Sequence, residues 1–155
     1  MGFLTGKTVI ITGAGRAVLK DGSCGSIGYG IATAYAKEGA NLVITGRNVK
    51  KLEAAKQELE SLYGIKVLTV QADVCAGGNN EATVANVVKQ AVDTFGGIQV
   101  LINNAQASAS GVPLAEHTTE QFDLAIYSGL YAAFYYMKAC YPYLAESHGS
   151  VINFA

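Results

Sequence analysis

Short apolar runs alternate along this chain with longer segments in which apolar residues recur every three or four positions. The short runs are rich in β-branched residues and are bounded by glycine-containing turns, which is typical of buried strands. The longer segments have the periodicity of helices with one buried face. The expected strands are 7–12, 41–45, 66–71, 99–103 and 150–154, and the expected helices are 27–38, 50–63 and 81–95.

A further, longer helix is expected to begin after residue 118. Thr118 and Gln121 have the spacing of a capping box, in which each side chain caps the backbone N–H of the other residue. Pro142 should bend or end this helix. Apolar residues at helical spacing should form its buried face, namely Phe122, Ile126, Leu130, Phe134 and Met137.

Five strands that alternate with four helices predict a parallel sheet, because neighbouring parallel strands need crossover connections. Right-handed crossovers then predict an α/β, Rossmann-like doubly wound sheet with strand order 3-2-1-4-5. We expect residues 1–155 to form a single domain that is incomplete, since the sequence stops after the fifth strand.

Composition limits the classes of partner. Of the 155 residues, 50% are hydrophobic, and a net charge of -1 gives no reason to expect nucleic acid or an anionic membrane surface. No apolar run approaches the roughly 18 residues of a membrane helix, and the N-terminus does not resemble a signal peptide. The three widely spaced cysteines, Cys24, Cys75 and Cys140, favour free thiols in the reducing cytoplasm. We expect no metal site.

A glycine-rich turn follows the first expected strand. It contains Gly13 and Gly15, and the next helix should begin near Ser26, Ile27 and Gly28. A strand, a glycine turn and a helix N-terminus together present free backbone N–H groups and the positive end of a helix dipole, which favour a pyrophosphate. Because glycine lets the backbone approach a phosphate closely, these five residues are expected to bind a dinucleotide.

The end of the second expected strand indicates which nicotinamide cofactor binds. An acidic residue there would hydrogen-bond a ribose 2′-hydroxyl and repel a 2′-phosphate, but the position holds Gly46, followed by Arg47 and Asn48. A guanidinium can hold a phosphate through two parallel hydrogen bonds. With Arg16 in the elongated turn as a second positive group, this favours NADP(H) over NAD(H).

Three motifs resemble those of the short-chain dehydrogenases/reductases, and they occur in the family's order. They are Thr12-Gly13, Asp73-Val74 and Asn103-Asn104-Ala105-Gln106. The resemblance implies that Asp73 hydrogen-bonds the adenine amino group, with Val74 contributing its backbone. It also implies that Asn104 braces the fourth strand and that Ala105 and Gln106 lie against the cofactor.

Four features depart from the family pattern. The turn between Gly13 and Gly28 is much longer than the family's, and Ser26 takes the place of its middle glycine. Gln106 replaces the last glycine of the family's NNAG motif. In the long helix, Gly129 stands where the family usually has an asparagine that helps to hold a water in a proton relay.

The family's catalytic residues are not expected within 1–155. The resemblance implies a serine after the fifth strand and a YxxxK motif on the next helix, whereas Ala155 aligns with the position before that serine. Residues 1–155 alone should therefore be inactive, poorly soluble and weak in NADP(H) binding. Tyr135, Tyr136 and Lys138 lie on the preceding helix and should serve packing or interfaces. Gln106 and Ser108 are weak candidates for substrate contact.

Two stretches, 103–111 and 122–144, resemble bacterial NADP-dependent 12α-hydroxysteroid dehydrogenases. This resemblance implies reversible oxidation of the 12α-hydroxyl of a bile acid, by a protein that is a homotetramer as many relatives are. An enoyl-acyl carrier protein reductase is the alternative, because residues 26–32 resemble the displaced glycine turn of that branch. A non-catalytic protein that keeps only the dinucleotide site is a third hypothesis.

Overall fold

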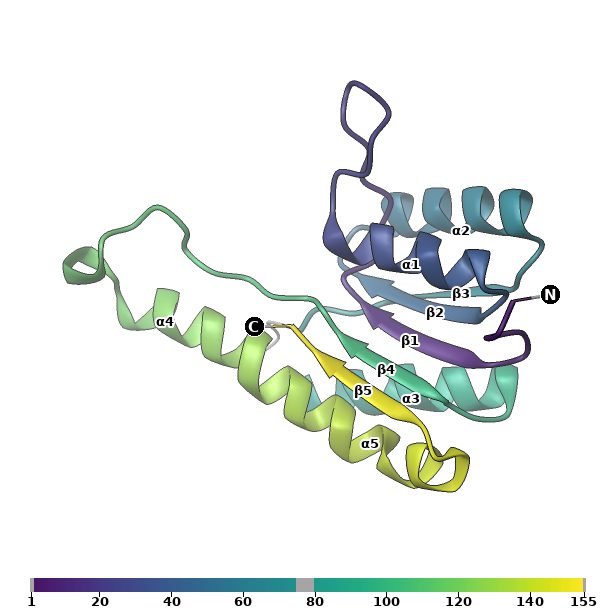
Figure 1. Ribbon diagram of the computed structural model, residues 1–155. Coiled ribbons are helices and arrows are strands. Elements are labelled where there is room, and N and C mark those ends of the chain that lie inside the picture. Colours follow the sequence, from purple (N-terminus) through teal and green to yellow (C-terminus); the bar gives the residue numbers. More distant parts are fainter. Residues whose placement is uncertain (1, 75–79, 155) are drawn as a thin grey trace.

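The computed structural model describes residues 2–74 and 80–154, in which a five-stranded sheet lies between two layers of helices (Figure 1). The strand pairs are parallel and their order is β3-β2-β1-β4-β5. This confirms the expected Rossmann-like fold and strand order. The strands are β1 (Thr8–Thr12), β2 (Asn41–Gly46), β3 (Val67–Gln71), β4 (Val100–Asn103) and β5 (Ser150–Asn153).

Helices α1 (Ile27–Lys37) and α2 (Val49–Tyr63) cover one face of the sheet. Helices α3 (Asn80–Phe95) and α5 (Ala132–Ser147) cover the other face. Between β4 and α5 the chain forms three short elements, one after another. They are the 3-10 helix η2 (Leu114–Glu116), helix α4 (Thr119–Ala125) and the π-helical turn η3 (Ile126–Tyr131).

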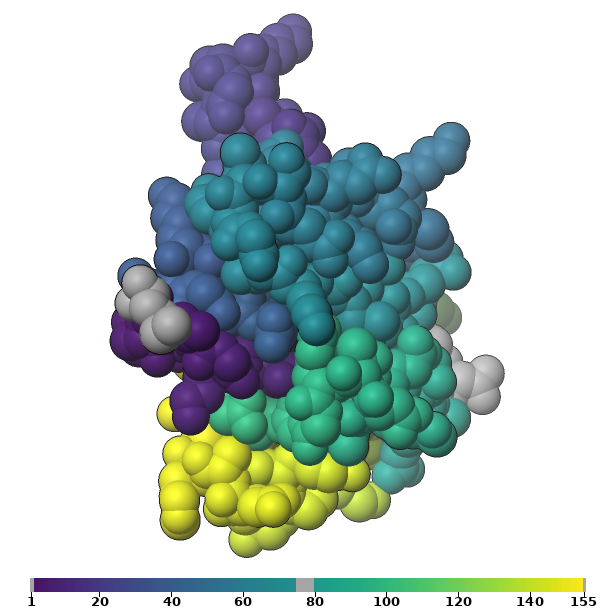
Figure 2. All heavy atoms as spheres, turned by 90° about the vertical axis from the view of Figure 1, so that its right-hand side faces the viewer, coloured from purple at the N-terminus to yellow at the C-terminus, as the bar shows by residue number. Residues whose placement is uncertain are grey.

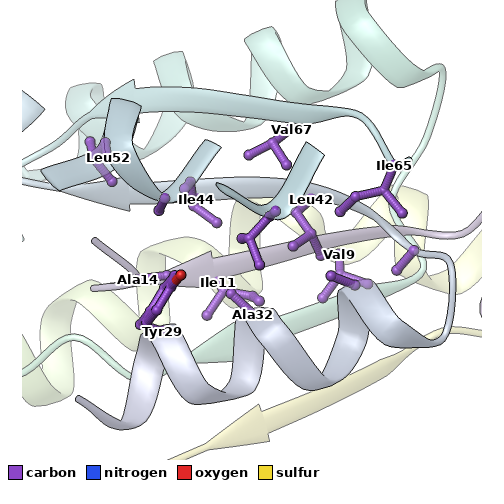
Figure 3. Close-up of a cluster of buried hydrophobic side chains, with 14 of the residues drawn as sticks. Val9, Ile11, Ala14, Tyr29, Ala32, Leu42, Ile44, Leu52, Ile65 and Val67 are labelled. Atoms are coloured by element: carbon purple, nitrogen blue, oxygen red, sulfur yellow. The ribbon is translucent and has the colours of Figure 1, made fainter. Parts of the chain in front are cut away.

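β1 lies at the centre of the core, because successive side chains of a strand point to opposite faces of the sheet. Val9 and Ile11 pack with Leu42 and with residues of α1 and α2, as Figure 3 shows. Ile10 packs with Val43 against α3 and α5. All five residues of β1 are buried. Helices on both faces therefore explain the continuous apolar run of this strand.

The ends of the helices follow local sequence signals. Ser26 Oγ accepts a hydrogen bond from the Tyr29 N–H and so caps α1. Asn48 Oδ1 accepts from the Lys51 N–H at 3.0 Å and caps α2, which ends at Gly64 in the left-handed region. The expected capping box of residues 118 and 121 is present at the start of α4.

The turn between β1 and α1 projects from the body of the molecule (Figures 1 and 2). Val18 and Cys24 form an isolated antiparallel bridge across it, so the extra length folds back on itself as a narrow loop. Cys24 is an exposed free thiol, whereas Cys140 is a buried one whose pKa is raised to about 12 by burial. Cys75 lies outside the described residues.

The long helix differs from the expectation in its buried face, and of the two effects expected of Pro142, the end of the helix is not seen. Its expected buried face is wrong, since Phe122, Leu130 and Phe134 are 59%, 64% and 51% exposed. Apolar residues occur around the whole helix, so periodicity did not distinguish its faces, and η3 is wider than an α-helical turn and shifts the register. Pro142 does not end the helix, because α5 continues to Ser147. The buried residues are spaced four apart: Ser128, Ala132, Tyr136, Cys140 and Leu144.

Candidate dinucleotide-binding site

A cleft of about 210 Å³ lies at the carboxyl ends of the strands. Its lining comes from four connections: Gly13 after β1, residues 45–47 at the end of β2, Ala72 and Val74 after β3, and residues 104–107 after β4. The chain leaves β1 towards α1 on one face of the sheet and leaves β4 towards α5 on the other. The cleft therefore occupies the switch point at which doubly wound sheets bind ligands.

Thr12 fastens the end of β1 to the end of β4. Its Oγ1 accepts hydrogen bonds from the backbone N–H groups of Asn104 and Ala105, at 3.0 and 2.9 Å. Asn104 Nδ2 donates to the Thr12 carbonyl at 2.9 Å and reaches the Gly13 carbonyl at 3.4 Å. The side chain of Asn104 thus braces both strand ends, and hydrogen bonds from two strands hold the floor of the cleft in place.

Gly13 and Gly28 allow the turn and the first helix to touch. Gly13 has a φ of 71°, in the left-handed region that glycine adopts readily. A Cβ at Gly28 would lie 2.2 Å from the Gly13 carbonyl oxygen and 2.6 Å from Asn104 Nδ2, so a larger residue does not fit. Ser26, Ile27 and Gly28 do not line the cleft, but the N-terminus of α1 is held beside Gly13, which does, and its dipole and free N–H groups suit a phosphate. Ser26 caps this terminus and Ile27, 65% exposed, begins the helix.

Arg47 lines the cleft at the end of β2, and its side chain is exposed. Of the residues described, none forms an ion pair with it, and no carboxylate is found among those that line the cleft. Asn48, the next residue, caps α2. The cleft therefore has a positive charge at its β2 end, which suits an additional phosphate on a dinucleotide.

Gly15 and Arg16 lie outside the lining of the cleft. Arg16 Nε donates to Glu58 Oε2 of α2 at 2.5 Å, and the Tyr29 hydroxyl donates to the other oxygen of this carboxylate. These hydrogen bonds hold the pKa of Glu58 below its usual value. A Cβ at Gly15 would lie 3.1 Å from Lys51 Cβ. Both residues thus lie against α2, and the ion pair of Arg16 with Glu58 attaches the elongated turn to that helix. The contact of Arg16 with a phosphate stays a prediction.

Asp73 and Val74 follow β3. Val74 lines the cleft, and Asp73 is exposed between it and Ala72, which is another lining residue. This position is compatible with the expected contact of Asp73 with an adenine, which stays a prediction. Residues 75–79 of the expected loop lie outside the described part of the chain.

Gln106 and Gly129, which both depart from the family pattern, meet in the structure. A Cβ at Gly129 would lie 3.4 Å from Gln106 Nε2. Gln106 lines the cleft, and Gly129 belongs to η3. The neighbouring Ser128 Oγ accepts from the Ala107 N–H at 2.9 Å, so the loop after β4 is fastened to the helix. Ser108 is exposed on the same loop.

The tyrosines and lysine of α5 have packing roles. Tyr136 is 1% exposed and belongs to the core, where burial raises the pKa of its hydroxyl. Lys138 Nζ forms an ion pair with Glu81 of α3 at 2.8 Å. The ring of Tyr135 lies against that of Tyr131, with centroids 6.0 Å apart. None of these three residues lines the cleft at the switch point.

Sequence patterns did not single out Thr45 or Ser128 as site residues. Thr12 was noted only as part of a family motif and was given no role of its own. A hydroxyl residue that ends an apolar strand beside a glycine turn is the one local signal that could have identified Thr12. The contact of Ser128 with Ala107 joins residues far apart in the sequence, so no local signal announces it.

Metal ligands and membrane spans were searched for in the described ranges. There, His, Cys, Asp and Glu form no group of three or more that could hold a metal ion. Among the helices of the same ranges, none has the length and apolar character needed to cross a membrane.

Comparison with known families agrees with this geometry. The family model described as short chain dehydrogenase matches residues 7–155, a range that includes the whole cleft. The chain belongs to the short chain dehydrogenase family. The five strands, the glycine turn and the bracing Asn104 all lie within the range that this family model matches.

Curated relatives of this short chain dehydrogenase include a hydroxysteroid dehydrogenase and a protein named as similar to one. The chain is 61% identical over 155 residues to 12α-hydroxysteroid dehydrogenase of Clostridium sp., covering 100% of this chain and 57% of that enzyme. It is 34% identical over 153 residues to human hydroxysteroid dehydrogenase-like protein 2, covering 94% of this chain and 33% of that protein. The chain therefore spans less than two thirds of these relatives.

Solved structures of the same fold contain either nicotinamide cofactor. L-sorbose reductase of Gluconobacter frateurii, complexed with NADPH and L-sorbose, has a TM-score of 0.83 and 30% identity, covering 99% of this chain and 53% of that one. NAD+-bound xylitol dehydrogenase has a TM-score of 0.82 and 25% identity, with coverages of 97% and 53%. The fold alone therefore does not select between the two cofactors.

Proposed function

We propose that this short chain dehydrogenase uses NADP(H) to interconvert a secondary alcohol and a ketone, and that its substrate is the 12α-hydroxyl of a bile acid. The observation that carries the cofactor assignment is Arg47, which is the only charged residue among the described residues that line the cleft. The 61% identity to a 12α-hydroxysteroid dehydrogenase supports the substrate. When bound, the nicotinamide supplies or accepts the hydride.

In this proposal residues 1–155 form the NADP(H)-binding domain. The pyrophosphate binds at the glycine turn and the first turn of α1, the 2′-phosphate binds at Arg47 and Asn48 with Arg16 as a further cation, and the adenine binds at Asp73 and Val74. Asn104 and Ala105 support the centre of the nucleotide. We propose that the catalytic serine, tyrosine and lysine follow residue 155 in the full-length protein, which is a cytoplasmic homotetramer.

Activity assays of the full-length protein test the reaction. NADP+ with deoxycholate should yield reduced cofactor, and NAD+ should support a much slower reaction. Oxidation of NADPH by a crotonyl thioester, without oxidation of the bile acid, would indicate an enoyl reductase instead. Tight NADPH binding with no turnover of either substrate would indicate a non-catalytic nucleotide-binding protein.

Substitution of Arg47 tests the cofactor assignment. Loss of a hydrogen-bonded charge pair costs about 1.5–3 kcal/mol, so Arg47→Ala should weaken NADP+ binding by about 10- to 100-fold. NAD+ binding should change little, because it lacks the 2′-phosphate. Arg16→Ala is the comparison and should weaken NADP+ binding less than Arg47→Ala, since Arg16 already pairs with Glu58. An equal loss for NADP+ and NAD+ in Arg47→Ala would contradict the assignment.

A further inference from the structure

Gln106 and Gly129 fit together as a pair. A Cβ at Gly129 would lie 3.4 Å from Gln106 Nε2 and 3.9 Å from its Cδ and Cγ. A methyl group at residue 129 would therefore be in van der Waals contact with the amide, so a longer side chain there and the Gln106 amide would compete for the same surroundings. The exposed side chain of Gln106 thus lies directly beside the position of the missing side chain at residue 129.

The helical surface beneath Gln106 is held from two sides. The Ala132 N–H donates to the Tyr127 carbonyl five residues earlier, which makes η3 a π-helical turn. Asn80 of α3, which is fully buried, donates through Nδ2 to the same carbonyl at 3.2 Å. On the cleft side, Ser128 Oγ accepts from the Ala107 N–H at 2.9 Å. Hydrogen bonds therefore hold the backbone on both sides of Gly129, which lies next to the Gln106 amide.

The order of the strands determines which part of a dinucleotide would lie near Gln106. β1 lies between β2 and β4, so the N-terminus of α1 is central, with Arg47 on one side of it and Gln106 on the other. A dinucleotide with its 2′-phosphate at Arg47 and its pyrophosphate at α1 extends its nicotinamide half towards Gln106. A glutamine amide both donates and accepts hydrogen bonds, as a nicotinamide riboside requires.

We propose that the Gln106 amide binds the nicotinamide half of NADP(H) and that Gly129 is the positioning residue that gives this amide its place. The inference rests on the proposed NADP(H) site. It joins two departures from the family pattern into one compensating pair, in which the loop after β4, and not the helix, supplies the amide at this point of the cleft.

Nucleotide binding to variants of the full-length protein tests the pair. The variants are Gln106→Met, which keeps the volume and removes the amide, Gly129→Asn, and the exchange Gln106→Gly with Gly129→Asn. Isothermal titration would compare NADPH with adenosine 2′,5′-bisphosphate, which has no nicotinamide half. Each single variant should weaken NADPH binding by about tenfold, which is typical of one lost hydrogen bond, and leave the bisphosphate unaffected. The exchange should bind NADPH more tightly than Gly129→Asn alone.

Several outcomes would overturn the inference. Unchanged NADPH binding in Gln106→Met would mean that only volume matters, and equal weakening of both ligands would mean a merely structural role. Additive losses in the exchange would mean that the residues are not coupled. Glu116→Gln, exposed on η2, is the control and should bind like the wild type. If the wild type binds NADH and not NADPH, the cofactor proposal fails separately, and the same variants can be compared with NADH.

Discussion

β1 consists of β-branched residues and β5 has two of them, Val151 and Ile152, at its centre, yet their environments are opposite. Every residue of β1 is buried, and every residue of β5 is exposed. Among the described residues, β1 has a paired strand on each side and helices on both faces, whereas β5 is the last strand of residues 1–155 and pairs there with β4 alone. A β-branched residue therefore contributes a different amount to the free energy of unfolding according to its place in the sheet.

This difference also explains where the site is precise. The carboxyl end of β1 is fixed by neighbours on all sides, and the hydrogen bonds of Thr12 transmit that order to the loop after β4. Binding residues placed beside a rigid strand keep their geometry without cost at the moment of binding. At the end of β5, Asn153 Oδ1 accepts from Asn103 Nδ2 at 2.8 Å, and Asn153 Nδ2 donates to Met137 Sδ at 3.6 Å.

The largest difference in stability is expected between a variant in β1 and a variant in β5. Ile10→Ala removes a fully buried side chain from the centre of the sheet and should lower the free energy of unfolding by about 2–5 kcal/mol. In a protein of residues 1–155, Ile152→Ala, at a residue that is 40% exposed there, should lower it by about 1 kcal/mol or less. Urea unfolding followed by circular dichroism would measure both. Similar losses in the two variants would contradict the expectation that Ile152 contributes little to the stability of residues 1–155.

The next largest effect is expected where the turn after β1 meets α1. Gly28→Ala places a methyl group 2.2 Å from the Gly13 carbonyl oxygen, and overpacking of this kind costs about 1–3 kcal/mol. The variant should also lose NADPH binding, because α1 must shift away from the cleft. Gly30→Ala is the control in the same helix, where a Cβ meets only Cys24 Sγ at 3.3 Å. If both variants unfold and bind alike, close contact at Gly28 is not required.

A smaller effect is expected from the hydrogen bonds at the strand ends. Thr12→Val leaves the Asn104 and Ala105 N–H groups without their acceptor, and should lower the free energy of unfolding by about 1–3 kcal/mol. Asn153→Ala at the exposed end of β5 should cost about 1 kcal/mol or less. Thr12→Ser keeps the hydroxyl and should behave like the wild type in thermal unfolding. Equal effects of Thr12→Val and Asn153→Ala would remove the distinction between the two ends.

The smallest effect concerns Glu58, which ties the turn after β1 to α2. Its pKa is lowered in the folded state by hydrogen bonds from Tyr29 and Arg16, so its contribution is present above the pKa of the unfolded chain. That contribution is lost as the pH falls through the lowered pKa. Glu58→Gln should therefore lower Tm by about 2–4 °C at neutral pH, with the difference shrinking in acid. Calorimetry against pH would test this, with the exposed Glu116→Gln as the control. A difference in Tm that does not depend on pH would contradict it.

Some of this structure could be predicted from the sequence, because the signals are local. The boundaries of the helices α1, α2 and α3 were predicted to within one residue, since each has a cap or a glycine stop beside a clear apolar periodicity. The buried face of α5 could not be predicted, because its aromatic and aliphatic residues surround the helix. Which of them is covered depends on α3, which packs against only one side.

The candidate site divides in the same way. The glycine turn and the residues that follow β2 were predicted as cofactor contacts from their own chemistry, and those that follow β3 and β4 from the family resemblance. Several of them line one cleft. The pairing of Arg16 with Glu58 and of Gln106 with Gly129 could not be predicted, since each joins segments distant in sequence.

The sequence by itself determined the order of strands and helices, and with it a parallel sheet whose connections switch faces between β1 and β4. Short-range preferences are sufficient for that, because apolar runs, caps and glycine turns act within a few residues. Only the tertiary structure decided which apolar residues are buried and which polar groups meet. Burial and hydrogen bonding depend on what lies across the sheet or the cleft, and that partner is supplied by a different part of the chain.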